Sequence, residues 1–315
     1  MTRARLPQLL AEARSGVLLF SVTPPKRSHP EERVKEIARL TLERLDGLDL
    51  DGLILYDIDD ESDRNPQERP FPFLATLDPV RYYRERLGGW RLPVVIYRCV
   101  GKYPEDELRD WMRGADPETV LGVFVGASSG SKEVHTTLRR AQELHAEVCP
   151  EMPLGAVAIG ERDGEHLRML AKQERGVGFF VTQVIYHVNE TKNLISDYFY
   201  ECRARGVQPR TVIFTVSLCG SLRTLEFLRW LGVDVPRWLE NSLRHADDTL
   251  AESYRQCLDI VRDLRDYCEH LGLPYGFNIE SVSIRKAEIE ATHRLAADVA
   301  ELLREFRPSE MRGNS

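Results

Sequence analysis

Eight short apolar runs, separated by longer stretches with helical periodicity, are the feature that most limits how this 315-residue chain can fold. The runs are continuous rather than alternating, and they are rich in β-branched and aromatic residues. Both properties are typical of parallel strands that are buried on both faces. The runs lie at residues 16–22, 52–57, 93–99, 121–126, 153–159, 177–186, 211–217 and 275–281.

Amphipathic stretches connect these runs, for example at residues 30–45, 104–112, 132–146, 165–173 and 192–205. A strand followed by a helix, repeated around the chain, predicts a TIM-type (β/α)8 barrel in the α/β class, with right-handed crossovers. An open doubly wound sheet is the alternative, but the evenly spaced units leave no obvious edge strand. A chain of this length is ordinary for a barrel that forms a single domain, so we expect one domain over residues 1–315.

Four segments depart from the regular strand–helix pattern. A basic amphipathic helix is predicted at residues 4–14, and the polar connection at residues 58–77 is unusually long. Residues 236–271 predict extra helix before the eighth strand, and residues 308–315 predict a frayed tail.

Charge and cysteine content exclude several classes of function. The net charge of −7 would repel a polyanion, which argues against nucleic-acid binding. No stretch approaches the roughly 20 apolar residues of a membrane helix, and the N-terminus does not resemble a secretory signal. The six cysteines form no CxxC pair and no zinc-ligand spacing with histidine. We therefore expect a cytoplasmic protein without a metal site, and the evenly charged helix surfaces favour no oligomer interface.

The active site of such a barrel lies at the C-terminal ends of its strands. The polar residues at or just after the ends of the apolar runs are therefore the candidates for function. They include Ser21, Asp57, Ser128, Ser129, Glu161, Thr182, Gln183, Tyr186, Asn278 and Glu280.

An acidic cluster follows the second run. Its carboxylates could hold a divalent metal or a cationic part of a substrate. The alternative, which we favour, is a solvated loop whose carboxylates pair with Arg64, Arg69 or Arg98, because the spacing does not match a calcium loop. The cluster consists of Asp57, Asp59, Asp60, Glu61 and Asp63.

The loop at residues 126–132 reads Gly-Ala-Ser-Ser-Gly-Ser-Lys and precedes a predicted helix. Backbone N–H groups at a helix start can bind an anion, but the spacing is not that of a P-loop. A tight turn with Ser131 as helix cap is the preferred interpretation. A modest anion-binding role for Ser128 and Ser129 stays open.

Two strands carry polar residues among apolar neighbours. Thr182 and Gln183 end the sixth run, where a buried glutamine needs hydrogen-bond partners. Asn278 and Glu280 share one face of the eighth strand. If that face is the barrel interior, Glu280 is a buried carboxylic acid and a possible general acid; if it faces the helices, it belongs to a structural ion pair. Tyr186 and His187 are adjacent, so only one of the two can face the pocket.

Four motifs, taken in order, resemble the methylenetetrahydrofolate reductase family, a group of flavin-dependent barrels. Residues 20–26 (Phe-Ser-Val-Thr-Pro-Pro-Lys) are similar to the family's F-E-F-F-P-P-R, and residues 181–186 (Val-Thr-Gln-Val-Ile-Tyr) are similar to I-T-Q-F-F-F. Residues 232–238 resemble N-V-x-I-P-x-W, and residues 284–288 resemble N-R-A-E. The resemblance covers nearly the whole chain and implies the same barrel fold.

The departures from the family pattern concern the acid and the flavin. Ser21 stands where the family has its proton-donating glutamate, and residues 126–129 lack the aspartate of the family's R-G-D. The FAD-holding pattern at residues 158–165 keeps only its first alanine and two glutamates, Glu161 among them. The glutamine on the folate side, Gln183, matches, so FAD is doubtful while a reduced folate remains the implied substrate.

The resemblance implies reduction of methylenetetrahydrofolate to methyltetrahydrofolate with NAD(P)H as a possible donor. Glu280 or Asp57 would replace the missing acid, and Gln183 would anchor the pterin. Substrate contacts are expected from Thr182, Ser21, Tyr186 and Asn278, and cofactor contacts from Ser128, Ser129 and Glu161. The alternatives are a folate-dependent one-carbon or methyl transferase, and a folate-binding protein without catalysis.

Overall fold

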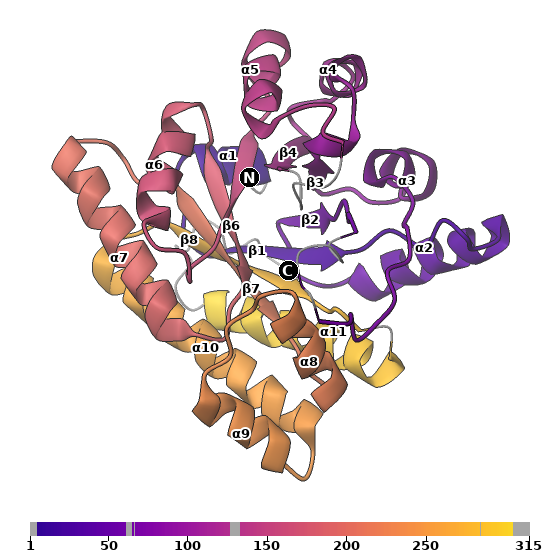
Figure 1. The fold of residues 1–315 in the computed structure, drawn as a ribbon, viewed down its shortest axis with the longest axis vertical. Coiled ribbons are helices and arrows are strands. Elements are labelled where there is room, and N and C mark those ends of the chain that lie inside the picture. Colours follow the sequence, from indigo (N-terminus) through magenta and orange to yellow (C-terminus); the bar gives the residue numbers. More distant parts are fainter. Residues whose placement is uncertain (1–4, 61–64, 66, 127–132, 284, 305–315) are drawn as a thin grey trace.

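The apolar runs form eight parallel strands that close into a barrel in sequence order, β1 to β8 (Figure 1). The computed structural model describes residues 5–60, 65, 67–126, 133–283 and 285–304. The predicted (β/α)8 barrel is therefore confirmed. The strands are β1 Val17–Val22, β2 Gly52–Leu55, β3 Val94–Cys99, β4 Val120–Val125, β5 Leu154–Ala158, β6 Phe179–Val184, β7 Thr211–Ser217 and β8 Tyr275–Glu280.

Helices surround the barrel, and two of them lie in the segment before β8 where extra helix is predicted (Figure 1). A short 3₁₀ helix, η2 Val100–Lys102, follows β3 directly. The α-helices are α1 Leu6–Ala11, α2 Glu31–Leu45, α3 Pro79–Arg86, α4 Glu105–Arg113, α5 Leu138–Val148, α6 Glu165–Glu174, α7 Val188–Arg205, α8 Leu222–Trp230, α9 Arg237–His245, α10 Thr249–Leu271 and α11 Lys286–Arg304.

The hydrophobic core has two parts, because side chains along a strand point alternately inward and outward. The inner part fills the barrel with residues such as Leu19, Ile54 and Phe179. Leu6 of α1 belongs to the same cluster and packs against Gly52, where β2 begins. Helix α1 thus closes the N-terminal end of the barrel. The larger, outer part lies between the strands and the surrounding helices.

Several helix boundaries differ from the predicted ones, and local hydrogen bonds explain two of the differences. Helix α5 begins at Leu138 because the Thr137 side chain accepts the backbone N–H of Arg140. Helix α7 begins at Val188 because His187 caps it in the same way, with Glu190 as donor. The N-terminal helix is shorter than predicted, and the tail at residues 308–315 lies outside the described part of the chain.

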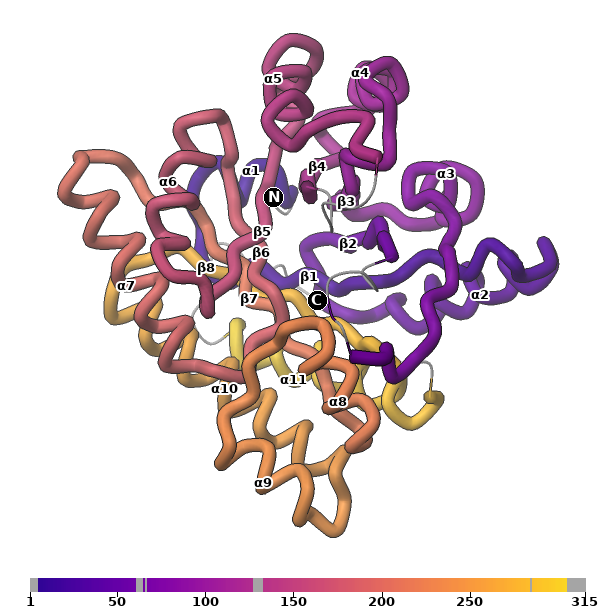
Figure 2. The backbone as a smooth tube through the Cα atoms, viewed as in Figure 1, coloured from indigo at the N-terminus to yellow at the C-terminus, as the bar shows by residue number. Residues whose placement is uncertain are grey.

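Two contacts hold the long connection after β2, one with the segment after β1 and one with α8. On one side Lys26 and Thr76 form an antiparallel bridge. On the other side the Trp230 indole N–H donates to the Gln67 carbonyl at 2.9 Å, so the connection also contacts α8. In Figure 2 its described part passes beside α8 and then continues to α3.

All six cysteines are buried, and none of them forms a disulfide: Cys99, Cys149, Cys202, Cys219, Cys257 and Cys268. Among the helices of the described ranges, none is both long and apolar enough to span a membrane.

Candidate functional site at the C-terminal mouth of the barrel

A polar cluster lines the inner face of β1, β8 and the residue after β2. The Ser21 hydroxyl donates to Asn278 Oδ1 at 2.7 Å and lies 3.1 Å from the Tyr56 hydroxyl oxygen. The Asn278 amide nitrogen donates to Tyr56 at 3.2 Å and to the Thr215 hydroxyl at 3.3 Å. The Tyr56 hydroxyl donates to Glu280 Oε2 at 2.5 Å. Asn278 and Glu280 therefore face the barrel interior, which resolves the alternative that the sequence leaves open.

Glu280 is the acid of this cluster. Glu280 is buried, with 8% of its surface exposed. Burial raises its pKa to about 7, although the hydrogen bond from Tyr56 acts in the opposite direction. No hydrogen bond to its second oxygen, Oε1, is found within the described ranges. A carboxyl group with this pKa can release or accept a proton near neutral pH.

Tyr97 completes the wall beside Glu280. Its ring packs edge-on against that of Tyr56, with 4.9 Å between centroids. Burial, followed by the charge of Glu280, raises the Tyr97 pKa, so the phenol stays protonated. Its hydroxyl has no hydrogen-bond partner among the residues that the structure describes. The same holds for the buried Ser217 hydroxyl, which the β7 alternation places on the inner face with Thr215.

A bulge at the end of β6 separates the roles of Thr182 and Gln183. The β6–β7 register shifts between Val181 and Val184, and the Thr182 hydroxyl accepts the Thr215 backbone N–H at 2.9 Å. Thr182 therefore stabilises the bulge instead of facing a ligand. The Gln183 amide nitrogen donates to the Leu231 carbonyl at 3.1 Å, which leaves the half-buried Gln183 with its carbonyl oxygen available as an acceptor.

Tyr186 lies in the layer between the barrel and the helices. Its hydroxyl donates to the Ser217 carbonyl at 2.7 Å, and burial raises its pKa well above the usual value. Because the strand has ended and the side chain turns outward, Tyr186 does not line the mouth as predicted. Asn278 is also fully enclosed, with 0% exposed surface, so it holds its neighbours instead of contacting a substrate. Ser21 is tied into the same cluster.

Asp57 belongs to a separate cluster outside the barrel, because its neighbour Tyr56 takes the inward position. Its Oδ2 accepts the Cys99 backbone N–H at 2.8 Å and the Tyr103 hydroxyl at 2.9 Å. Its Oδ1 accepts Lys102 Nζ at 2.5 Å. This pairing makes Asp57 a fixed structural carboxylate and not the relocated acid. Its pairing partner is Lys102 rather than one of the predicted arginines, and Glu61, Asp63 and Arg64 lie outside the described residues.

Glu161 lies on the rim after β5, near Asp234 and His187. Burial raises its pKa despite an exposed side chain, and the negative charge of Asp234 adds to the shift. His187 Nε2 lies 3.8 Å from Asp234 Oδ2. The predicted cofactor role of Glu161 stays a prediction, and Ser128 and Ser129 lie outside the described residues.

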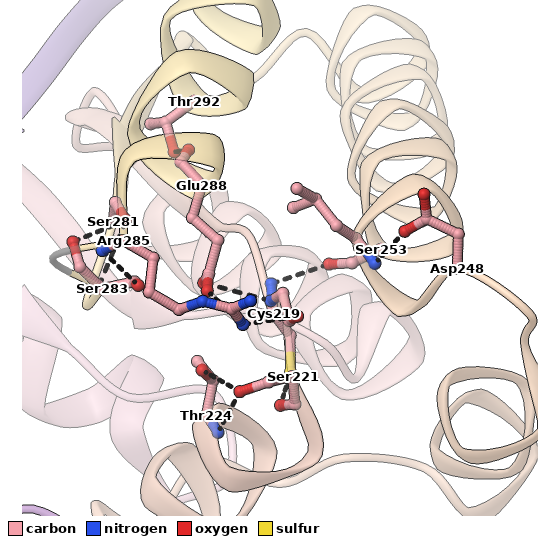
Figure 3. A network of polar contacts seen from close by, with 12 residues as sticks. Cys219, Ser221, Thr224, Asp248, Ser253, Ser281, Ser283, Arg285, Glu288 and Thr292 are labelled. Carbon is pink, nitrogen blue, oxygen red and sulfur yellow. Dashed lines mark hydrogen bonds and ion pairs between the residues drawn. The ribbon is translucent and has the colours of Figure 1, made fainter.

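The turn after β7 is held in place by a buried glutamate of α11, Glu288. Glu288 reaches toward the turn after β7, with Arg285 beside it (Figure 3). Its Oε2 accepts the Gly220 backbone N–H at 3.3 Å, and its Oε1 lies 3.3 Å from Arg285. The preceding N–H, of Cys219, donates to the Ser253 hydroxyl of α10 at 2.8 Å. The extra helix α10 thus helps to fix this loop.

This arrangement does not fit a flavin phosphate at β7–β8. TIM barrels often bind a cofactor phosphate between the loops after strands seven and eight. Here the carboxylate of Glu288 already occupies the Gly220 N–H, and a Cβ on Gly220 would lie 2.3 Å from Glu288 Cδ. A second anion at this position would meet a buried negative charge in a filled space.

The substitution Gly220→Ala is expected to destabilise the fold by about 1–3 kcal/mol, because the new methyl group would displace the Glu288 carboxylate. Urea unfolding of the variant measures the loss. Gly178→Ala is the matched control, since a Cβ there meets its nearest atom at 3.8 Å. Equal midpoints for the two variants would show that Glu288 does not pack on Gly220 as described.

Sequence reasoning missed Tyr56, Tyr97 and Glu288. The two tyrosines sit at the ends of strongly apolar runs, where an aromatic residue looks like core material. The available signal is their parity: each has the strand position that faces inward at the C-terminal end. Glu288 carried no such signal, because nothing in a helical repeat shows that its carboxylate reaches a turn 68 residues away.

Comparison with solved structures finds a chain of similar sequence and others of similar fold. No protein-family model and no curated protein matches. Among solved structures, the EDTA monooxygenase EmoA from Chelativorans sp. BNC1 is 12% identical with a TM-score of 0.53, covering 96% of this chain and 97% of that chain. The oxygenating constituent of 3,6-diketocamphane monooxygenase from Pseudomonas putida is 9% identical with a TM-score of 0.54, covering 91% and 97%. These two likenesses show the fold alone.

A third solved structure is much more similar. It is an uncharacterized protein from Clostridium thermocellum that binds two copies of 5-methyl-5,6,7,8-tetrahydrofolic acid. It is 40% identical to this chain with a TM-score of 0.84, and the match covers 94% of this chain and 99% of that one. The chain therefore belongs to the family of this Clostridium thermocellum barrel protein.

Proposed function

We propose that this protein binds a reduced folate at the C-terminal mouth of the barrel and reduces methylenetetrahydrofolate, with Glu280 as the general acid. The observation that carries the folate part is the 40%-identical relative that binds 5-methyltetrahydrofolate. The ordered motif resemblance to methylenetetrahydrofolate reductases supports the reaction.

The chemistry of the mouth suits the pterin of a folate. A pterin presents N–H donors and ring acceptors along one edge, so it needs both kinds of partner. Gln183 offers an acceptor oxygen, while Tyr97 offers a hydroxyl group that has no partner among the described residues. Tyr97 on β3 lies near Glu280, whose charge adds to the rise of the Tyr97 pKa.

The proposed reduction needs one proton from the protein and one hydride from a donor. The bond between the bridging carbon and N10 breaks, N10 takes the proton of Glu280, and the carbon takes a hydride. NAD(P)H is the proposed hydride source and leaves as NAD(P)⁺, and Glu280 regains its proton from water. The raised Glu280 pKa, about 7, keeps a substantial fraction of this acid protonated near neutral pH.

In this proposal Glu280 supplies the acid that is missing at the position of Ser21. Ser21 and Glu280 lie on neighbouring strands, β1 and β8, and both contact the Tyr56 hydroxyl. The carboxyl group has in effect moved one strand around the barrel while remaining at the same end. Asp57, which is paired outside the barrel, has no part in this mechanism.

Calorimetric titration with methyl- and methylenetetrahydrofolate, without added flavin, tests the binding. We expect micromolar affinity, since the relative binds such a ligand. Failure of all reduced folates to bind would overturn the proposal.

NAD(P)H oxidation in the presence of methylenetetrahydrofolate tests the reaction. The substitution Glu280→Gln is expected to lower the turnover number about a hundredfold, because general acids typically contribute at least this much, while folate still binds. Glu143→Gln, in an exposed ion pair on α5, is the matched control and should not change turnover. Folate binding with no turnover under either nicotinamide donor would instead indicate a folate-binding protein without this reaction.

A further inference from the structure

Hydrogen-bond accounting in the polar cluster determines the direction of each bond. Asn278 has one acceptor oxygen and one amino group. Its oxygen accepts from Ser21, and its amino group supplies one hydrogen to Tyr56 and one to Thr215. The orientation of the amide is therefore determined by its neighbours on β1 and β7.

The consequence for Tyr56 is that its hydroxyl oxygen already accepts a hydrogen bond from Asn278. The Ser21 hydrogen is used on Asn278, which leaves the single Tyr56 hydrogen for the carboxylate 2.5 Å away. A bond to a carboxylate is stronger than a bond to a neutral hydroxyl, so Glu280 is the preferred acceptor.

We infer that Tyr56 is a positioning residue for Glu280, held as a donor by Ser21 and Asn278, so that Oε2 is fixed and Oε1 is presented to the ligand. The inference rests on the proposed function only for the identity of that ligand. Ser21 then has a defined use: it stands where related enzymes carry the acid, and it orients the group that orients the new acid.

The groups that face Glu280 support a single dominant partner. The titratable neighbours inside the barrel are Tyr56 and Tyr97, and Tyr186 in the outer layer is also influenced by the Glu280 charge. All three are phenols whose raised pKa values keep them neutral. Burial and the Tyr56 hydrogen bond account for the shift of the Glu280 pKa. Removal of the Tyr56 hydroxyl should therefore change the titration of Glu280 more than any other single deletion in the cluster.

The test is the pH titration of the Glu280 carboxyl group in the ligand-free protein, monitored by carboxyl-carbon NMR. The signal of Glu280 is assigned by its absence from the spectrum of Glu280→Gln. Tyr56→Phe is expected to raise the midpoint by about one pH unit, since it removes a bond that stabilises the charged form. Ser21→Ala should raise it by less. Tyr254→Phe is the matched control, because that hydroxyl donates to Asp298 on the helical surface.

The double variant Ser21→Ala/Tyr56→Phe decides whether Ser21 acts through Tyr56. We expect its midpoint to equal that of Tyr56→Phe, because the orienting effect has no remaining target. Equal effects of Ser21→Ala with and without the Tyr56 hydroxyl would overturn the inference. So would an unchanged midpoint in Tyr56→Phe or, should that variant not fold, in Ser21→Ala.

The measurement uses no folate, so its outcome is independent of the proposed function. A shifted midpoint together with failed folate binding would leave the positioning role intact and remove the folate. Folate binding with unshifted midpoints would do the reverse. When folate does bind, Tyr56→Phe should also move the pH profile of turnover upward by the same amount as the titration midpoint.

Discussion

Replacement of Glu280 by glutamine is expected to raise the free energy of unfolding relative to the wild type as the pH rises. The difference between the two proteins should be roughly 3 kcal/mol larger at about pH 8 than at about pH 4. The ordinary glutamate pKa is 4.5, and burial raises the folded value to about 7. Between these values the folded state holds a proton that the unfolded state has lost. Wild-type stability therefore falls as the pH rises through this window, and it levels off above the folded pKa.

Glutamine stays neutral at every pH, so the variant lacks this loss. Urea unfolding at several pH values between about 4 and 8 gives the free energy of unfolding of both proteins. The difference between the variant and the wild type should grow with pH. Glu143→Gln should show no such trend, since that carboxylate is exposed and its pKa is lowered by Arg139. A difference that stays constant with pH would show that Glu280 has an ordinary pKa in the folded protein.

Together with the expected loss of turnover, this result would show that Glu280 is retained for chemistry at a cost in stability. Within the described residues this buried acid has one hydrogen-bond partner, Tyr56, which makes it unfavourable to fold. Proteins commonly accept such costs at functional sites. The gain in stability and the loss in activity are thus two consequences of one side chain.

Replacement of Arg98 by methionine is expected to lower the free energy of unfolding by about 3 kcal/mol, because it removes the buried partner of the partly exposed Asp78 carboxylate. Only 2% of the Arg98 side chain is exposed, and its guanidinium donates to Asp78 at 2.5 Å. The guanidinium carbon also lies 3.6 Å from the centroid of the Tyr103 ring. Burial is the largest single influence and acts to raise the Asp78 pKa. The charge of Arg98, together with hydrogen bonds from the Arg81 N–H, Arg98 and Tyr103, outweighs it and leaves the pKa below its usual value.

The loss should be largest at neutral pH. Because the Asp78 pKa is lowered on folding, its contribution to stability is present above the ordinary value of 3.8 and disappears at lower pH. Urea unfolding at neutral and acidic pH tests both statements. Arg98→Lys should recover part of the loss, since it keeps the charge without the planar stacking.

Arg39→Met is the control for Arg98→Met. It breaks an exposed pair with Glu43, in which both side chains are more than half exposed, and such pairs contribute little. If Arg98→Met lowers the free energy of unfolding no more than Arg39→Met does, then the contacts of Arg98 with Asp78 and Tyr103 do not stabilise the connection that begins at Asp57 and ends at Asp78.

The hydrophobic pattern alone predicts the architecture. Runs such as residues 211–217 are apolar on both faces, and only strands covered from both sides can bury them. Each run is too short for a membrane helix, and the evenly spaced units leave no obvious edge strand for an open sheet. The same pattern places Gln183 and Glu280 at strand ends, because the strand direction sets which end of a barrel carries the site.

The orientation of individual side chains depends on local geometry that the pattern does not contain. At the end of β6 one extra residue in a bulge changes the alternation, so Tyr186 turns outward and Thr182 bonds to β7. After β2 the inward position belongs to Tyr56 and not to Asp57, which is decided by the register with β1. A shift of one residue exchanges the two faces.

The sequence by itself therefore determines the barrel and the end at which its chemistry lies, since both follow from burial along the chain. Only the tertiary structure decides which partners each acid has. Asp57 and Glu280 are both acids near strand ends, but Asp57 meets Lys102 and a backbone N–H, whereas Glu280 meets one phenol in a buried site. These partners come from residues distant in the sequence, and it is they that set the charge and the pKa.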